Sequence, residues 1–257
     1  MSSEHPVYLA TVGLDRNRWG SREPSFAVSE WLSRWQEDGF DGVELWEYHY
    51  CDVEDSEREQ LVDGAYMIPL YNTYTGFSDS EEDTAGRASA VAAVEALRAT
   101  GIKYNLGRDE SLMETYRRNL LAWSEAMPDT CRLLCECHAG TVLEELETAT
   151  AFFADLDPDR FGVIAHLNGD AEGLDRWFEA WGDRLAHLHL QHRNGSPAPS
   201  TPEGAERMTA CVQVLKDHGF DGSAAIEFTR GIGPDEQIKT LYANTVNDMN
   251  AYREAWA

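Results

Sequence analysis

Short apolar runs alternate along the whole chain with longer segments in which apolar residues recur at helical spacing. Continuous apolar runs of this length are typical of strands in a parallel sheet that is buried on both faces. We predict eight such strands, in the ranges 6–13, 40–46, 65–74, 102–107, 132–138, 161–167, 184–192 and 220–228.

The segments between these runs carry helix signals. In the range 26–37, Trp31 and Trp35 have helical spacing, and Gly39 follows as a stop. Ser80 precedes three acidic residues, the pattern of an N-cap with a negatively charged first turn. The predicted helices cover 26–37, 54–63, 80–100, 114–127, 142–156, 171–181 and 203–218, and a last helix begins at Pro234.

Eight strands that alternate with eight helices, with no linker between them, predict one fold. We expect a single (β/α)₈ TIM barrel over residues 1–257. An internal similarity supports repeated units, because GFDGVELWE at 39–47 parallels GFDGSAAIE at 219–227. Both segments combine a helix-ending glycine, a tight turn, a strand and a carboxylate at the same offset.

Ionisable residues gather at the carboxyl ends of the later strands, where α/β barrels hold their functional groups. Alternation along the strand 132–138 predicts that Leu134, Glu136 and His138 share one face. The next three strands end in His166, in the set His187, His189 and His192, and in Glu227. Because four consecutive strands each end in a possible ligand, we predict a metal site there.

The composition of the chain argues against some binding partners and some cellular locations. The net charge is −25, with only three lysines, and such a surface repels nucleic acid and anionic membranes. The chain has no long apolar run and no signal-peptide pattern at its start. Its odd number of cysteines, five, favours reduced thiols in the cytoplasm. The spacing of Cys131, Cys135, Cys137 and His138 does not fit a structural zinc site.

Four segments resemble motifs of the xylose isomerase-like TIM barrels, a family of sugar isomerases and epimerases that also includes a DNA-repair endonuclease. The segments are GFDGVEL at 39–45, ECHAGT at 136–141, RLAHLHLQH at 184–192 and GFDGSAAIE at 219–227. The resemblance implies one divalent metal ion, bound by Glu136, His189 and Glu227 together with a residue at the end of the sixth strand.

Two positions depart from the family pattern. His166 stands where the family has Asp, so the expected ligand set is Glu136, His166, His189 and Glu227. Additional imidazole shifts the preference from Mg²⁺ toward Mn²⁺, Fe²⁺, Co²⁺ or Zn²⁺. Gln191 and His192 follow the strand-seven ligand where the family usually has Lys and Asp.

The resemblance and the charges predict an isomerase or epimerase of a sugar or sugar derivative. Glu136 and Glu227 would be the catalytic acid and base next to a substrate carbonyl. Substrate contacts are predicted for His138, His192, Glu47 and Trp46. Glu44 is interpreted either as a buried structural carboxylate or as a substrate contact. For Trp19, Trp46, Tyr71 and Tyr74, packing in the barrel is favoured over stacking on a sugar.

Two other functions stay open. A lyase that eliminates a group next to the carbonyl of a keto-sugar, or that cleaves a C-glycoside, begins with the same proton abstraction. A binding protein could keep the fold without catalysis, and failure to bind metal would favour it. A nuclease is opposed by the charge of −25. We expect a small carbohydrate as the substrate, a homo-oligomer as one possible assembly, and an active-site loop at 192–204.

Overall fold

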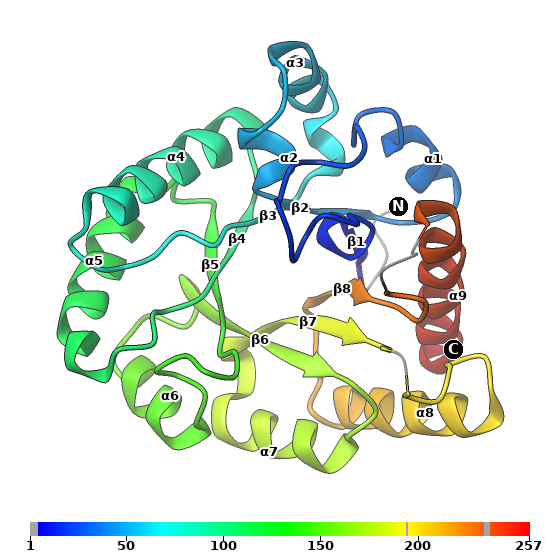
Figure 1. The fold of residues 1–257 in the computed structure, drawn as a ribbon. Helices are drawn as coiled ribbons and strands as arrows, with labels where there is room; N and C mark the ends of the chain where they lie inside the picture. The colour runs from blue at the N-terminus through cyan, green and yellow to red at the C-terminus, as the bar shows by residue number, and fades with distance from the viewer. Residues whose placement is uncertain (1–4, 194, 234–236) are drawn as a thin grey trace.

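Eight parallel strands form a closed barrel in which spatial order follows chain order from β1 to β8 (Figure 1). The structure is a computed structural model, and it describes residues 5–193, 195–233 and 237–257. The strands are β1 (Val7–Ala10), β2 (Gly42–Trp46), β3 (Leu70–Asn72), β4 (Gly101–Tyr104), β5 (Arg132–Glu136), β6 (Phe161–Leu167), β7 (Leu185–Gln191) and β8 (Ser223–Phe228). The predicted (β/α)₈ fold is therefore confirmed.

The helices surround the strands as an outer layer (Figure 1). They are α1 (Leu32–Glu37), α2 (Tyr48–Cys51), α3 (Asp55–Asp63), α4 (Glu81–Leu97), α5 (Met113–Ala126), α6 (Leu146–Phe153), α7 (Ala171–Trp181), α8 (Pro202–Asp217) and α9 (Ile238–Trp256). Among the described residues, none of these helices has the length and apolar character needed to cross a bilayer. Pro234, where the last helix was predicted to begin, lies outside the described residues.

The main apolar core lies between the strands and the helices, and a smaller one lies inside the barrel. The inner layer consists of Leu70, Leu134, Ile164 and Ala186. Leu134 precedes Glu136 on β5, so this layer lies nearer the amino ends of the strands than the ionisable residues do. The apolar layer therefore closes the barrel beneath a polar cluster that faces the carboxyl ends.

Two local predictions agree closely with the structure. Ser80 caps α4, because its side-chain oxygen accepts a hydrogen bond from the backbone nitrogen of Asp83 at 3.1 Å. Gly39 and Gly219, the glycines of the internal similarity, both have positive φ angles, of 105° and 66°. Left-handed backbone of this kind ends a helix at little cost only when the residue is glycine.

Several predicted strands are shorter than expected, and the largest differences are at β1 and β3. The strand predicted over 6–13 ends at Ala10, and a 3-10 helix follows over Thr11–Gly13. The turn brings Gly13 against the backbone of Glu227, where a Cβ atom would lie only 2.0 Å from the carbonyl oxygen. The strand predicted over 65–74 covers only Leu70–Asn72. Pro69 precedes it and has no N–H to extend the ladder.

Two predicted helices also begin later, and one helix was not predicted. In the segment 26–37 only Leu32–Glu37 is α-helical, and in the turn before it the backbone N–H of Ser29 donates to the Glu57 carboxylate at 2.9 Å. The helix predicted over 142–156 covers Leu146–Phe153. The unpredicted α2 follows β2 directly and is a single turn.

Candidate metal centre

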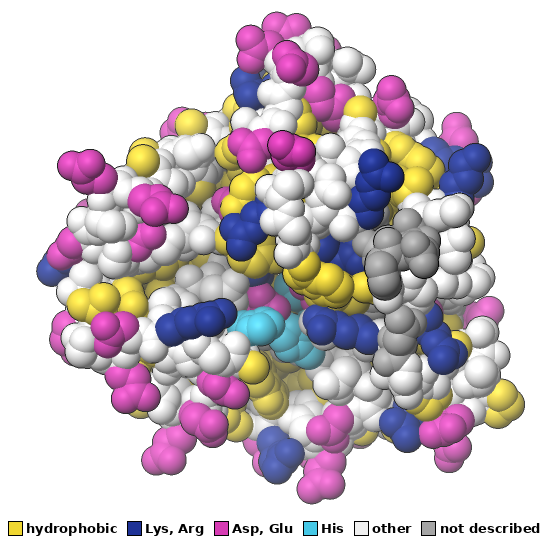
Figure 2. Space-filling model, in the orientation of Figure 1, with side chains coloured by type: hydrophobic (Ala, Val, Ile, Leu, Met, Phe, Trp, Pro, Cys, Tyr) yellow, Lys and Arg dark blue, Asp and Glu magenta, His cyan; other side chains and the backbone are white. Residues whose placement is uncertain are grey.

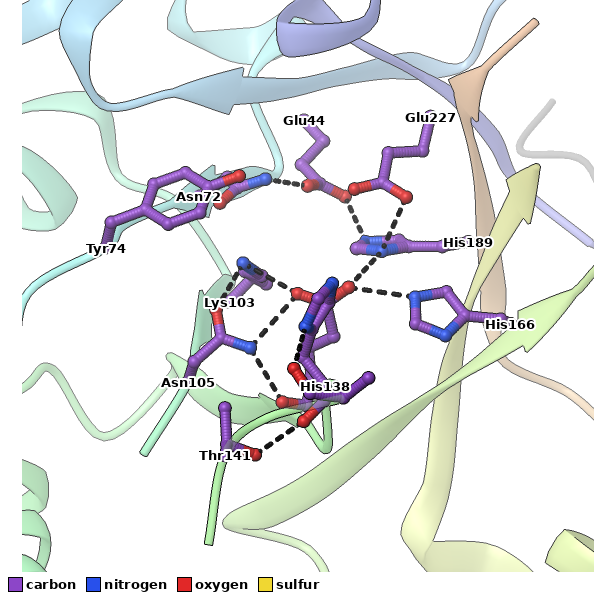
Figure 3. A network of polar contacts seen from close by, with 12 residues as sticks. Glu44, Asn72, Tyr74, Lys103, Asn105, His138, Thr141, His166, His189 and Glu227 are labelled. Carbon is purple, nitrogen blue, oxygen red and sulfur yellow. Dashed lines mark hydrogen bonds and ion pairs between the residues drawn. The ribbon is translucent and has the colours of Figure 1, made fainter. Parts of the chain in front are cut away.

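Four side chains from consecutive strands meet at the carboxyl end of the barrel. Glu136 ends β5, His166 lies near the end of β6, His189 lies on β7 and Glu227 lies on β8. One ligand atom from each of the four lies within 4.8 Å of the others. Figure 3 shows the carboxylates and imidazoles pointing toward one another. The structure therefore brings together the four residues that the sequence proposed as ligands.

His189 is the central member of this group. Its Nδ1 atom lies 3.4 Å from Oε2 of Glu227 and 3.6 Å from Oε1 of Glu136. The atom is buried and has no hydrogen-bond partner among the described residues. On the other side of the ring, Nε2 lies 3.0 Å from the Glu44 carboxylate, which accepts its hydrogen. With Nε2 engaged by Glu44, Nδ1 is the ring nitrogen that faces the two carboxylates.

This arrangement fits a divalent cation. Burial alone would lower the pKa of His189, but the Glu227 and Glu44 carboxylates raise it well above its usual value. The surroundings of Nδ1 thus favour positive charge, which a proton or a metal ion can supply. Two carboxylates and two imidazoles form a donor set suited to Mn²⁺, Fe²⁺, Co²⁺ or Zn²⁺. The hydrogen bond from His189 to Glu44 is the outer support that metal-binding histidines commonly have.

Glu44 lies below the four proposed ligands and is completely buried. It accepts a hydrogen bond from Asn72 and contacts Nε2 of His187 at 3.3 Å. Burial alone would raise the pKa of Glu44, but His189 and His187 lower it. Of the two interpretations of Glu44, its position fits the buried structural carboxylate, which orients His189 and does not line the cavity.

Lys103 is a buried cation in direct contact with the site. Its Nζ atom lies 2.8 Å from Oε2 of Glu136, 2.7 Å from Oδ1 of Asn105 and 4.2 Å from the centre of the Tyr74 ring. Burial alone would raise the pKa of Glu136, but Lys103, the hydrogen bond with His166 and the nearby His189 hold it well below its usual range. Lys103 therefore keeps Glu136 ionised and fixes one of its two oxygens.

A cavity of about 550 Å³ opens above the four proposed ligands, large enough for a monosaccharide. Glu136, Glu227, His138 and Trp46 line it. Figure 2 shows histidine at the base of the hollow. Trp19 also lines the cavity and is 66% exposed, so the packing interpretation is wrong for this residue.

His138 lines the cavity from the turn after β5 and not from the strand itself, as was predicted. The strand predicted over 132–138 ends at Glu136, and the backbone nitrogen of His138 turns back to the Glu136 carbonyl at 2.8 Å. The shared face expected from alternation therefore does not extend to His138. The residue is exposed at the rim, where its Nδ1 lies 2.7 Å from the carbonyl oxygen of Ala139.

Two residues predicted to contact substrate lie away from the cavity. His192 is buried, and its Nδ1 lies 3.7 Å from Asp248 of α9. His187, His189 and Gln191 all contact carboxylates inside the barrel, so alternation along the strand places His192 on the opposite face, toward α9. Glu47 does not line this cavity, because its carboxylate accepts hydrogen bonds from Thr73 at 2.6 Å and from the backbone of Tyr74 at 2.9 Å.

Comparison with known proteins decides the family. The model of the xylose isomerase-like TIM barrel family matches residues 32–244, well over half of the chain. The chain belongs to this family. A comparison with curated protein sequences gave no match.

Solved structures of the same fold are similar over almost the full length. A D-psicose 3-epimerase from Clostridium cellulolyticum H10, solved with D-tagatose, has a TM-score of 0.70 at 12% identity and covers 97% of this chain and 99% of its own. The probable 3-DHS dehydratase AsbF from Bacillus anthracis has a TM-score of 0.69 at 14% identity, with 96% and 97% covered. The 3-keto-D-glucoside 4-epimerase YcjR from E. coli has a TM-score of 0.62 at 14% identity, with 98% and 97% covered.

Within this xylose isomerase-like barrel, sequence reasoning missed the partners of Glu136. Lys103 and Asn105 both contact Glu136, the amide of Asn105 by two hydrogen bonds. A signal was present, because lysine is rarely buried without a partner and Lys103 interrupts the apolar strand 102–107. Gln191, at a position where the chain departs from the family pattern, donates to Oε2 of Glu227 at 2.6 Å.

Proposed function

We propose that this chain is a divalent-metal-dependent isomerase or epimerase of a sugar or sugar derivative. The observation that carries the proposal is the bare Nδ1 of His189, buried between Glu136 and Glu227 and backed by Glu44. Glu136, His166, His189 and Glu227 would hold the ion. Bound there, a divalent cation would polarise a carbonyl and a neighbouring hydroxyl of the substrate.

The two carboxylates differ in how fully their oxygens are engaged. Glu136 accepts from Lys103 and Asn105 on Oε2 and from His166 on Oε1. Glu227 accepts from Gln191 on Oε2. Hydrogen bonds to a carboxylate stabilise its charged form and weaken it as a base. We therefore assign the first proton abstraction, at the carbon next to the carbonyl, to Glu227.

Glu136 would act on the other proton of the reaction. In an epimerisation the proton must return to the opposite face of the carbon, which requires a second acid. Because Lys103 keeps Glu136 ionised, Glu136 would return a proton that it receives from His166, whose Nε2 lies 2.8 Å from its Oε1. His138 and Trp46 at the wall of the cavity would orient the sugar.

Solvent exchange tests the proposal directly. The full chain, loaded with Mn²⁺ or Co²⁺, is incubated in D₂O with a panel of ketoses and 3-keto-glycosides, and deuterium is located by NMR. We expect deuterium at the carbon next to the carbonyl of at least one sugar, together with an isomer or epimer. His189→Ala should lose both the metal and the exchange, whereas His218→Gln, a change at a histidine outside the site, should lose neither.

A lyase acting on a keto-sugar or C-glycoside is the second candidate. It is favoured by the departures at His166 and Gln191 from the pattern that the family resemblance implies for isomerases. Product analysis in the same experiment separates the two reactions, because elimination gives an unsaturated product or a released aglycone. A protein that binds no metal and exchanges no deuterium with any of these sugars would be a binding protein, and the enzyme proposal would be wrong.

A further inference from the structure

The side chains that line the cavity include more basic than acidic residues, which is the opposite of the chain as a whole. Acidic side chains outnumber lysine and arginine by 46 to 21 in the whole sequence. Four arginines line the cavity, namely Arg18, Arg22, Arg108 and Arg193. Among the described lining residues, the acidic ones are Glu136 and Glu227, both assigned to the metal. Figure 2 shows dark blue side chains around the hollow and most magenta ones at the periphery.

These arginines come from different parts of the chain. Arg18 and Arg22 lie in the segment between β1 and α1, Arg108 follows β4, and Arg193 follows β7. Loops at the carboxyl ends of barrel strands are where substrate-binding groups are carried. Convergence of cations from three separate loops on one cavity is not expected of a surface whose charge is otherwise strongly negative.

Three of the arginines are not used in ion pairs. Arg22, Arg108 and Arg193 have no carboxylate within 4.0 Å in the part of the chain that the structure describes. Six of the other arginines pair with carboxylates at 2.5 to 2.9 Å, namely Arg34, Arg58, Arg117, Arg118, Arg207 and Arg253, whereas Arg176 on α7 has no such pair among the described residues. What distinguishes Arg22, Arg108 and Arg193 is that they line one cavity, where they keep cationic capacity for a ligand.

Aromatic neighbours support two of the three guanidinium groups. The centre of the Arg193 guanidinium lies 4.4 Å from the centre of the Phe228 ring. Arg22 donates to the hydroxyl of Tyr48 at 2.7 Å and lies 5.4 Å from the centre of its ring. A guanidinium beside an aromatic ring is held in place yet keeps further N–H groups for a ligand. The pair of N–H groups on one edge suits the two oxygens of a carboxylate or phosphate.

We propose that the substrate carries an anionic group, a phosphate or a carboxylate, which Arg22, Arg108 and Arg193 bind at the mouth of the cavity. The carbonyl end of the same molecule would then lie at Glu136 and Glu227. The inference rests on the proposed function for the placing of the carbonyl end, whereas the anion site rests on the arginines alone. A neutral sugar would bring no negative charge to these three cations.

The inference can be tested by binding alone, by comparing an anionic sugar with its neutral counterpart. Binding to the full metal-loaded chain is measured by calorimetry for D-fructose 6-phosphate against D-fructose, and for D-glucuronate against D-glucose. We expect at least one anion to bind about tenfold or more tightly than its neutral partner. A preference within the first pair identifies a phosphate, and one within the second pair identifies a carboxylate. Equal binding within both pairs would overturn the inference.

Arginine variants locate the site. Arg22→Gln, Arg108→Gln and Arg193→Gln should each weaken binding of the preferred anion by about tenfold, with metal content unchanged. Arg176→Gln removes the same charge from an exposed arginine on α7 that does not line the cavity, and it should have little effect. Anion binding that is insensitive to all three mouth variants would place the anion elsewhere and refute the inference.

The experiments distinguish failure of the anion site from failure of the proposed isomerase function. If the chain binds the anion through these arginines but exchanges no deuterium with any sugar, the anion site stands and the isomerase proposal falls. If neutral ketoses exchange deuterium at the same rate in wild type and in the three mouth variants, and anions bind no better, the isomerase proposal stands and the anion site falls.

Discussion

The Nε2 atom of His189 lies 3.0 Å from the carboxylate of Glu44, a residue 145 positions earlier in the chain. The contact connects β2 with β7 across the interior of the barrel. It holds Nε2 of His189 toward Glu44 and thus leaves Nδ1 facing Glu136 and Glu227 (Figure 3). Glu44 therefore acts on the proposed metal centre without touching the metal.

Glu44→Gln should weaken metal binding. The amide keeps the shape of the side chain but removes the negative charge that supports His189 as a ligand. Changes to such outer partners typically reduce affinity by about 10- to 100-fold. Titration with Mn²⁺ or Co²⁺ measures the loss, with His218→Gln as the control. A dissociation constant equal to that of wild type in a folded variant would contradict the role of Glu44.

Glu227→Gln should damage catalysis more than folding. It removes the proposed base while keeping the size of the side chain, and deuterium exchange at saturating metal should fall by about a hundredfold or more. The melting temperature of the metal-free protein should change little or rise, because a buried anion has been removed. A large loss of stability with a proportionate loss of exchange would instead indicate a structural carboxylate.

Lys103→Met should destabilise the metal-free protein by about 3–5 kcal/mol, since it leaves Glu136 buried without its cation. Urea denaturation in the presence of a chelator measures the free energy of unfolding. The double variant Lys103→Met with Glu136→Gln should recover much of the loss, because neither charge is then left unpaired. Equal and additive losses in the two single variants would show that the pair is not coupled.

Asp248 should make stability depend on pH. Burial raises its pKa to about 7, although Thr229 and Arg230 oppose the shift. The neighbouring His192 has its pKa lowered to about 4 by burial and is neutral over most of the range between the two values. A raised carboxyl pKa means that the folded state holds a proton that the unfolded state has released. The stabilisation from this group is complete below about pH 4 and is lost as the pH rises through 7.

The variant Asp248→Asn isolates this effect from that of His192, which is present in both proteins. Thermal unfolding of wild type and variant is compared at intervals from pH 4 to pH 8. Wild type should lose stability relative to the variant across this range, by on the order of a few kcal/mol. A constant difference between the two proteins would mean that Asp248 has an ordinary pKa.

Gly13→Ala should disturb the site through the backbone. A Cβ atom at this position would lie 2.0 Å from the carbonyl oxygen of Glu227, so β8 must shift. We expect a loss of stability of about 1–3 kcal/mol and weaker metal binding. Gly20→Ala is the matched control, because the nearest atom to its Cβ would be 3.8 Å away. Normal metal binding by Gly13→Ala would show that the strand tolerates the displacement.

The sequence by itself determined the order of strands and helices, because hydrophobic periodicity is a local property of the chain. It also determined which strand ends carry possible ligands. A closed parallel barrel brings all the carboxyl ends of its strands to one face, so Glu136, His166, His189 and Glu227 could be grouped before any distance was known.

Only the tertiary structure showed which side chains contact the proposed ligands and which lie away from their expected positions. The pairing of Lys103 with Glu136, and of Glu44 with His189, depends on which inward-facing side chains the strand register and tilt bring into contact across the barrel. One turn after β5 takes His138 off the strand, whereas His192 faces α9 as alternation with His189 and Gln191 requires. Alternation along one strand cannot reveal the contacts of Lys103 and Glu44, because their partners lie on other strands far away in the sequence.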